Sequence, residues 1–166
     1  MEKSNKLYIM VGIPGSGKST WIANHKSSFS RPYKIVSRDE IRFSLVAEDE
    51  EYFSKEKEVF KKFVEAIKEG LDSDLDVYAD ATHINEASRT KLLRALGCSL
   101  KGIKVEAIVI KPPFDIIEQQ NAQRTGREFV PLSAIRRMNG QFTMPSCEEG
   151  FNKVWIITNK GENNES

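Results

Sequence analysis

A glycine-rich segment near the amino terminus has the residue types and spacing of a phosphate-binding loop. Residues 12–19 read Gly-Ile-Pro-Gly-Ser-Gly-Lys-Ser, which fits the pattern Gly-x-x-x-x-Gly-Lys-Ser/Thr. Glycines let the backbone curve around a phosphate so that successive N–H groups point at it, and a following helix adds the positive end of its dipole. The spacing predicts a nucleotide-binding loop made of Gly12, Ile13, Pro14, Gly15, Ser16, Gly17, Lys18, Ser19 and Thr20.

Two residues of this loop have predicted chemical roles. In such loops the lysine, here Lys18, contacts the β- and γ-phosphates, and the next hydroxyl, here that of Ser19, ligates Mg²⁺. ATP and Mg²⁺ are therefore the expected cofactors. The loop alone does not separate a kinase from a GTPase or a motor ATPase, so the distinction depends on residues at other strand ends.

Aspartates follow two other apolar segments. Asp39 comes after Ile35-Val36-Ser37, and Asp80 ends a run that begins at Val77. Strand ends form the ligand crevice of an open parallel sheet, so we expect both carboxylates near the phosphates. Asp39 could accept the proton of an incoming hydroxyl, with Arg42 on the same helix face holding an anionic part of the acceptor, or Asp39 could simply cap a helix. Asp80 has the form of an acid that supports Mg²⁺ or pairs with an arginine, or it is a polar strand end exposed to water.

A polar, basic segment between two predicted helices has the composition of a lid. Residues 119–131 contain Arg124, Gly126 and Arg127. A short lid with arginine can close over ATP, exclude water and stabilise charge on the phosphoryl group, which favours transfer to a bound acceptor over hydrolysis. The alternative is a solvated loop between helices. His83, near Asp80, is expected in a polar loop, where it could touch the acceptor.

The elements that must position these residues alternate between strands and helices. This alternation predicts an α/β fold in three layers, with a parallel sheet of about five strands between helices. The helix at Ser54–Glu69 is predicted to begin at Ser54 and to stop at Gly70, and a second helix at Asn85–Leu96 is capped by Asn85 and followed by Gly97. A third opens at Pro112-Pro113 and runs to about Arg124. The predicted strands are Leu7–Val11, Tyr33–Ser37, Asp76–Asp80, Lys104–Ile110 and Lys153–Thr158.

Length and composition favour one soluble domain. The chain has 166 residues, and we assign residues 1–158 to a single domain and residues 159–166 to a frayed polar tail. No apolar run approaches the roughly 20 residues of a membrane helix, and no secretory signal is recognisable, so we expect a cytoplasmic protein without membrane contact. The formal net charge is +1, which gives no long-range attraction for a polyanion. An acidic run at residues 48–51 and arginines late in the chain leave a one-sided basic patch open.

Taken together, the motifs resemble the kinase domain of 5′-hydroxyl polynucleotide kinases, and the match runs from about Leu7 to Met138. It rests on the glycine-rich loop, Ser-Arg-Asp-Glu-Ile-Arg at 37–42, Asp-Ala-Thr-His at 80–83, Arg124, Val130-Pro131 and Ile-Arg-Arg-Met at 135–138. The resemblance implies a P-loop NTPase of the nucleotide-kinase-like type, which moves the γ-phosphate of ATP to a 5′-hydroxyl end of DNA or RNA during nucleic acid repair.

The resemblance also implies roles for single residues. They are Lys18 and Ser19 on the phosphates and Mg²⁺, Asp39 as general base, Arg42 on a phosphate of the acceptor, Asp80 in support of the metal region or lid, Arg124 on the transferring phosphate and Arg127 as its companion.

Departures from the family pattern keep other acceptors open. Gln119 and Gln120 stand where such kinases can carry another basic residue. One alternative is a P-loop kinase of a small metabolite or nucleoside, and another is a nucleotide-dependent binding module with slow ATP hydrolysis. The sequence shows no heptad seam that would indicate an oligomer.

Overall fold

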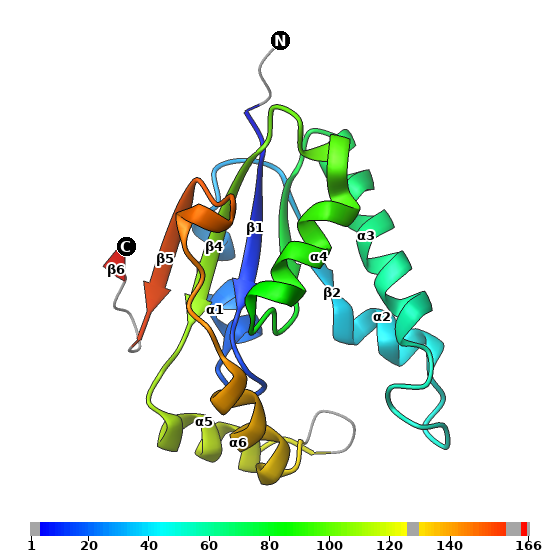
Figure 1. The fold of residues 1–166 in the computed structure, drawn as a ribbon, viewed down its shortest axis with the longest axis vertical. Coiled ribbons are helices and arrows are strands. Elements are labelled where there is room, and N and C mark those ends of the chain that lie inside the picture. The colour runs from blue at the N-terminus through cyan, green and yellow to red at the C-terminus, as the bar shows by residue number, and fades with distance from the viewer. Residues whose placement is uncertain (1–3, 126–129, 159–163, 166) are drawn as a thin grey trace.

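A parallel sheet organises the chain (Figure 1). The structure is a computed structural model and describes residues 4–125, 130–158 and 164–165. The strands follow the order β2-β3-β1-β4-β5-β6, in which the first five are parallel and the short β6 pairs antiparallel with β5. The predicted five-strand parallel sheet is confirmed. The strands are β1 (Lys6–Val11), β2 (Tyr33–Ser37), β3 (Asp76–Asp80), β4 (Lys104–Ile110), β5 (Lys153–Ile157) and β6 (Asn164–Glu165).

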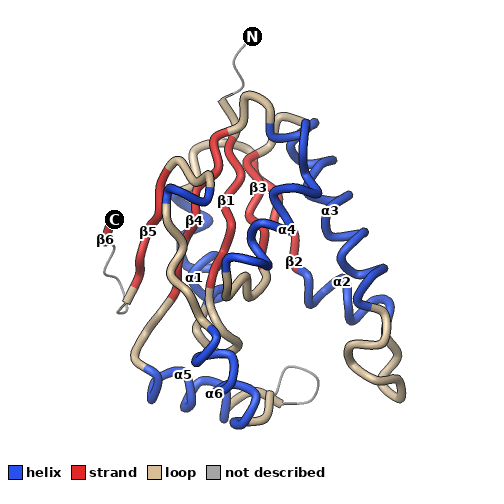
Figure 2. The backbone as a smooth tube through the Cα atoms, in the orientation of Figure 1, coloured by secondary structure: helices blue, strands red, loops and turns tan. Residues whose placement is uncertain are grey.

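Helices cover both faces of the sheet, which confirms the three-layer α/β fold. On one face lie α3 (Glu56–Asp72) and α4 (Glu86–Leu96), and on the other lies α1 (Lys18–His25) (Figures 1 and 2). The carboxyl ends of the strands face α2 (Arg38–Leu45), α5 (Phe114–Ala122) and α6 (Leu132–Gln141). Short 3₁₀ helices are η1 (Lys26–Ser28), η2 (Gly97–Leu100) and η4 (Cys147–Glu149). In the part of the chain that is described, no helix has the length and apolar character needed to cross a membrane.

The core follows the alternation of side chains along β1. Leu7, Ile9 and Val11 belong to the cluster under α3 and α4, whereas Met10 belongs to the cluster under α1. A third, smaller cluster lies at the carboxyl edge of the sheet. It joins the glycine-rich loop, the segment before α4, α5 and α6 through Ile13, Ile84, Ile117 and Ile135. This third cluster fixes the loop relative to the helices beside it.

Both boundaries of the helix predicted at Ser54–Glu69 differ from the prediction. Ser54 is not its N-cap, because the helix begins at Glu56, after Lys55. The stop expected at Gly70 is wrong, because α3 runs from Glu56 to Asp72 with Lys55 as its N-cap, and Gly70 is buried inside it. A Cβ atom at Gly70 would lie 2.7 Å from Val77 Cγ2 on β3. The glycine therefore serves close packing of α3 on the sheet rather than helix termination.

The predicted caps of the next helix are confirmed. The Asn85 side chain accepts a hydrogen bond from the backbone N–H of Ser88 at 2.8 Å, and Gly97 follows Leu96 with φ of 47°. The frayed tail predicted at residues 159–166 is wrong for Asn164 and Glu165, which pair with β5 as β6. The other residues of this tail lie outside the described residues. The proposed boundary at residue 158 stays a prediction.

Candidate active site

The glycine-rich loop joins β1 to α1, as its sequence predicts. Gly17 is the N-cap of α1 with φ of 99°, a left-handed conformation that favours glycine. At Gly12 a Cβ atom would lie 2.8 Å from the backbone oxygen of Ile110 on β4, so the loop needs glycine there to pass this close. The Ser16 hydroxyl is buried and has no hydrogen-bond partner among the described residues. These features fit a loop shaped around an anion.

Lys18 lies in the curve of this loop. Its Nζ donates hydrogen bonds to the backbone oxygens of Gly12 at 2.8 Å and Ile13 at 3.4 Å. Desolvation lowers the pKa of Lys18 below its ordinary value, and the nearby charge of Arg124 acts in the same direction, whereas Asp80 and Asp39 oppose the shift. Asp80, Asp39 and Arg124 thus each lie near enough to Lys18 to act on its charge.

Ser19 and Asp80 are in direct contact. The Ser19 hydroxyl donates to Asp80 Oδ2 at 2.9 Å, and Asp80 is buried at the end of β3. An exposed strand end, the alternative for Asp80, is therefore wrong. Mg²⁺ prefers oxygen ligands and commonly takes only one or two carboxylates, with water and phosphate filling the other positions. The pair fits such an ion, and no cluster of three or more His, Cys, Asp or Glu that could hold a metal occurs within residues 4–125, 130–158 and 164–165.

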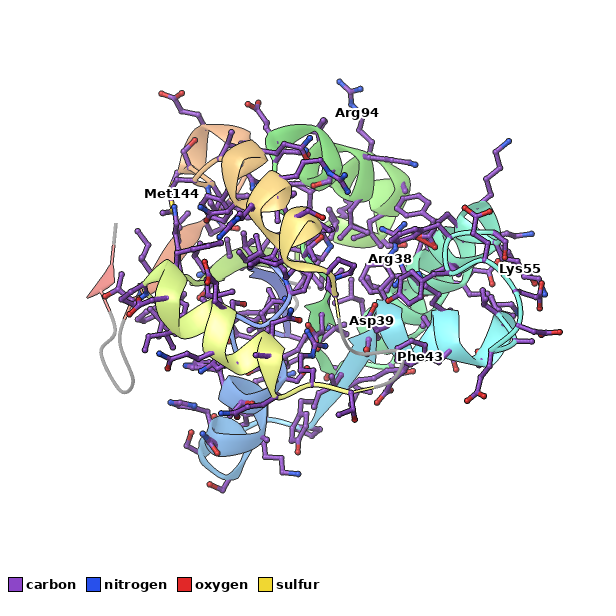
Figure 3. All side chains as sticks on the ribbon, turned by 90° about the horizontal axis from the view of Figure 1, so that it is seen from below. Arg38, Asp39, Phe43, Lys55, Arg94 and Met144 are labelled. Atoms are coloured by element: carbon purple, nitrogen blue, oxygen red, sulfur yellow. The ribbon has the colours of Figure 1, made fainter. Side chains whose placement is uncertain are left out.

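Asp39 lies in the first turn of α2. The N-cap of this helix is Ser37, whose hydroxyl accepts from the backbone N–H of Glu40 at 3.2 Å, so the capping alternative for Asp39 is wrong. Asp39 Oδ1 instead accepts hydrogen bonds from Arg42 Nη1 and, at 3.1 Å, from the Tyr52 hydroxyl. The Asp39 side chain is 52% exposed. Figure 3, seen from the carboxyl edge of the sheet, shows it between α2 and α5.

Arg42 is held from two sides. Its Nε and Nη2 donate to the two carboxylate oxygens of Glu56 at 3.0 and 2.6 Å, and its Nη1 reaches Asp39. The predicted juxtaposition of Asp39 and Arg42 is confirmed, although the Arg42 side chain is only 7% exposed. Sequence reasoning missed Tyr52 and Glu56, because neither is at helical spacing from Asp39. Their contacts fix the orientation of the Asp39 carboxylate.

The predicted lid is shorter than expected. Residues 119–122 belong to α5, and Arg127 lies outside the described residues. Arg124 follows α5, is partly buried and acts electrostatically on Lys18. Asn121, which sequence reasoning missed, is buried and bonds both backbone groups of Val130, with Nδ2 donating at 2.6 Å and Oδ1 accepting at 3.2 Å. This double hydrogen bond holds the two ends of the segment together.

His83 is buried rather than in a polar loop, so that expectation is wrong. Its Nδ1 donates to the backbone oxygen of Met10 at 2.8 Å, and its backbone has φ of 45°. Burial lowers the pKa of His83 to about 4, and the charges of Arg38, Lys18 and Arg89 act in the same direction. The imidazole is therefore neutral near pH 7 and does not serve as a cation in the site.

Arg89 is a structural cation that the sequence did not reveal. It is 1% exposed, and its Nε and Nη2 donate to the Glu149 carboxylate at 2.8 and 3.1 Å. Its Nη1 donates to the backbone oxygens of His83 at 2.9 Å and Thr143 at 3.0 Å. Arg89 thus ties α4 and the chain between α6 and β5 to the segment that follows Asp80.

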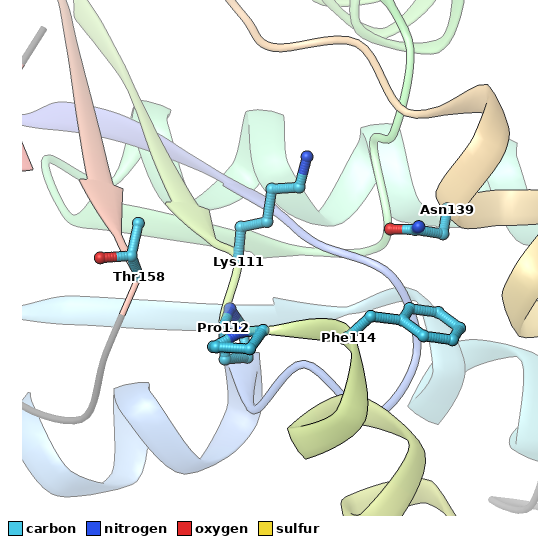
Figure 4. Close-up of a pocket in the computed structure, with 6 residues that line it drawn as sticks. Lys111, Pro112, Phe114, Asn139 and Thr158 are labelled. Atoms are coloured by element: carbon cyan, nitrogen blue, oxygen red, sulfur yellow. The ribbon is translucent and has the colours of Figure 1, made fainter.

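A separate hollow lies at the ends of β4 and β5 (Figure 4). It measures about 380 Å³ and contains none of the predicted site residues. Its lining residues are Lys111, Pro112, Pro113, Phe114, Asn139 and Thr158.

Comparisons with known proteins agree with this geometry. Residues 7–145 match the family AAA_33, described as an AAA domain. Transcription factor bHLH140 of Arabidopsis thaliana is 21% identical over 151 residues, which are 88% of this chain and 15% of that protein. A chain of the Pnkp1/Rnl/Hen1 RNA repair complex is similar with a TM-score of 0.71 and 24% identity, over 85% of this chain and 45% of that one. A sugar kinase from Janibacter sp. HTCC2649 is similar with a TM-score of 0.64 and 13% identity, over 93% and 85% of the two chains.

The chain therefore spans less than half of bHLH140 and of the RNA repair chain. The structural similarities, all below 25% identity, concern the fold, and they include a kinase. The family match, in contrast, covers well over half of the chain. The protein thus belongs to the AAA_33 family, and its glycine-rich loop lies in a P-loop kinase-like fold.

Proposed function

We propose that the protein is an ATP- and Mg²⁺-dependent kinase that transfers the γ-phosphate of ATP to the 5′-hydroxyl end of DNA or RNA. The observation that carries the proposal is the half-exposed carboxylate of Asp39, oriented by Arg42 and Tyr52 and electrostatically coupled to Lys18. Nucleotide binding alone requires no oriented acid beside the phosphate loop. Transfer to a hydroxyl uses such a group to accept the proton of the acceptor.

The proposed reaction is an in-line transfer. Asp39 accepts the proton of the acceptor hydroxyl. The oxygen of that hydroxyl forms a bond to the γ-phosphorus while the bond from phosphorus to the leaving ADP oxygen breaks. Lys18 and Arg124 compensate the negative charge on the phosphoryl group, and Arg127 is proposed to assist from the lid. Ser19 and Asp80 would hold Mg²⁺, which supplies additional charge neutralisation at the phosphates when it is bound.

Several observations support a nucleic-acid acceptor. The motifs resemble 5′-hydroxyl polynucleotide kinases, and the fold is similar to that of a chain in an RNA repair complex. Arg136 and Arg137 lie on α6, next to the lid, where they could contact the phosphates of a bound strand. Arg42 would act on a phosphate of the acceptor through the end of its guanidinium that faces Asp39.

A second candidate is a kinase of a small metabolite or nucleoside. The fold is also similar to that of a sugar kinase, and the acidic residues 48–51 follow α2, on the side of the site that carries Asp39. Such an acidic segment disfavours a long polyanion on that side. A nucleotide-dependent binding module with slow hydrolysis is the remaining alternative, and in it Asp39 would have no chemical role.

The direct test is transfer of labelled γ-phosphate from ATP to oligonucleotides. We expect label on 5′-hydroxyl DNA or RNA and none on 5′-phosphorylated controls. Lys18→Ala should lower the rate by at least about 100-fold, because a charge that stabilises the transition state is lost, whereas the exposed Lys26→Ala should match wild type. ATP binding without label on either oligonucleotide would refute the proposal. Label on a sugar or free nucleoside in parallel reactions would then support the second candidate.

A further inference from the structure

One aromatic side chain that packs on Tyr52 and Arg42, the two residues bonded to Asp39, is more exposed than packing alone would favour. Phe53, in the connection between α2 and α3, is 56% exposed, the highest value among the large hydrophobic residues described as exposed. Burying a phenylalanine contributes roughly 1.5–3 kcal/mol, so leaving it in water forgoes a sizeable stabilisation. Single exposed hydrophobic residues are common, and the surroundings of Phe53 decide what this one can do.

The Phe53 ring packs against Tyr52 and Arg42. The Tyr52 ring meets it edge to face, with centroids 4.6 Å apart, and the Arg42 guanidinium lies 5.4 Å from the Phe53 centroid. Arg42 is in turn anchored by two hydrogen bonds to Glu56. The Phe43 ring packs against Tyr52, with centroids 6.2 Å apart. The platform, as we name the Phe43, Tyr52 and Phe53 rings, therefore has a fixed arrangement with one ring largely open to solvent.

Tyr52, a member of the platform, directly contacts the proposed general base. Tyr52 contributes its ring to the platform and its hydroxyl to Asp39, at 3.1 Å. A molecule whose hydroxyl approaches Asp39 would therefore have its neighbouring groups close to these rings. Phe43 lies four residues after Asp39 on α2, and Figure 3 shows the two side chains on the same side of the molecule.

Charge restricts what can rest on the platform. Glu48, Asp49 and Glu51 are exposed in the same connection, and the Glu50 carboxylate accepts from the backbone N–H of Ala47 and from Lys55. This acidic segment repels phosphate groups. A planar, uncharged group is then the suitable partner for an exposed ring, and every nucleobase presents such a face.

We infer that Phe53, supported by Tyr52 and Arg42, stacks on the nucleobase of the 5′-terminal nucleotide of the acceptor. The inference rests on the proposed function and narrows it to acceptors that carry a base next to the reacting hydroxyl. Phosphates further along the strand lie away from residues 48–51.

Kinetic comparison of two oligonucleotides tests the inference. One has an ordinary 5′-terminal nucleotide and the other an abasic one with the same 5′-hydroxyl. Base–aromatic stacking contributes roughly 1–3 kcal/mol, so Phe53→Ala should raise KM for the ordinary oligonucleotide by about 5- to 150-fold. The KM for the abasic oligonucleotide should change less than about twofold, since it has no base to stack. Phe53→Trp should restore wild-type KM, because it retains a stacking face.

Met144→Ala is the matched control. Met144 is also exposed, at 43%, and lies on the far side of the molecule from Asp39 in Figure 3. This variant should leave both KM values unchanged. Equal effects of Phe53→Ala on the two oligonucleotides, or no effect on either, would overturn the inference.

A binding measurement separates this inference from the proposed function. Stacking should quench the added tryptophan of Phe53→Trp when the ordinary oligonucleotide binds, and the abasic one should leave it unquenched; wild type, with Trp21 and Trp155, supplies the background. Base-dependent quenching without phosphate transfer would refute the proposed kinase activity but support base stacking on Phe53. Phosphate transfer without base-dependent quenching would support the proposed kinase activity but refute base stacking on Phe53.

Discussion

At the scale of single residues, Lys18 and His83 differ in how far their surroundings could be anticipated. Lys18 is defined by its neighbours in sequence, because the loop spacing alone places its ammonium in the curve of the backbone. His83 is defined by chain segments far from it, since its ring is covered by Phe63 and bonded to Met10. The position of Lys18 in the loop therefore followed from the motif, and its role on the phosphates stays a prediction. The burial of His83 could be seen only in the fold.

The buried His83 gives the protein a specific dependence of stability on pH. Its pKa is about 4 in the folded chain against an ordinary value near 6.5, so the unfolded chain binds a proton that the folded chain does not between these values. The contribution to stability is complete above about pH 6.5 and falls as the pH decreases toward 4. The free energy of unfolding should drop by about 2 kcal/mol between pH 7 and pH 5 from this group.

Urea unfolding at pH 7, 6 and 5 measures this effect. His83→Asn removes the titrating group, and asparagine tolerates the left-handed backbone at this position, so its stability should vary by less than about 0.5 kcal/mol over this range. If the stability of His83→Asn fell between pH 7 and pH 5 as much as that of wild type, His83 would not be the source of this pH dependence.

At the scale of elements, the five parallel strands followed from apolar runs and were placed to within a residue, because a central parallel strand must be apolar on both faces. The short β6 contains no apolar residue and was not predicted. The end of α3 was misjudged, since the glycine that normally ends a helix here faces the sheet. The salt bridge between Arg89 and Glu149 also could not be anticipated from the sequence. The two residues are 60 positions apart, and nothing in the sequence pairs them.

Two glycines on helices should respond oppositely to alanine. At Gly70 the new methyl group would meet Val77 Cγ2 at 2.7 Å, so overpacking of about 1–3 kcal/mol should exceed the gain in helix propensity of about 1 kcal/mol and destabilise the protein. At Gly140 on α6 an added methyl group would point into open space, with no described neighbour within 4 Å, and alanine should stabilise by about 0.5–1 kcal/mol. Thermal unfolding of both variants measures the difference. Equal stabilisation by the two substitutions would contradict the packing described for α3.

At the scale of the whole molecule, the site is composed of two unlike walls. The wall of α2 and α3 supplies Asp39, the platform and the acidic residues 48–51, whereas the wall of α5 and α6 supplies Arg124 and the exposed Arg136 and Arg137. The formal net charge of +1 conceals this asymmetry. Sequence reasoning predicted the fold and the position of the glycine-rich loop between β1 and α1, because both depend on local patterns. The proposed acceptor side depends on how the connection between α2 and α3 brings Tyr52 to Asp39, which no motif encodes.

We propose that this protein moves phosphate to an acceptor hydroxyl with Asp39 as the base. The most direct test measures, in one reaction, the phosphate transferred to a 5′-hydroxyl oligonucleotide and the inorganic phosphate released, together with the Kd for ATP. We predict that transfer to the oligonucleotide exceeds phosphate release in wild type. Asp39→Asn should lower transfer by at least about 100-fold while ATP affinity changes little. The neighbouring Glu40→Gln should behave as wild type. If Asp39→Asn transferred phosphate at the wild-type rate, or if wild type released inorganic phosphate without transfer, the account would be contradicted.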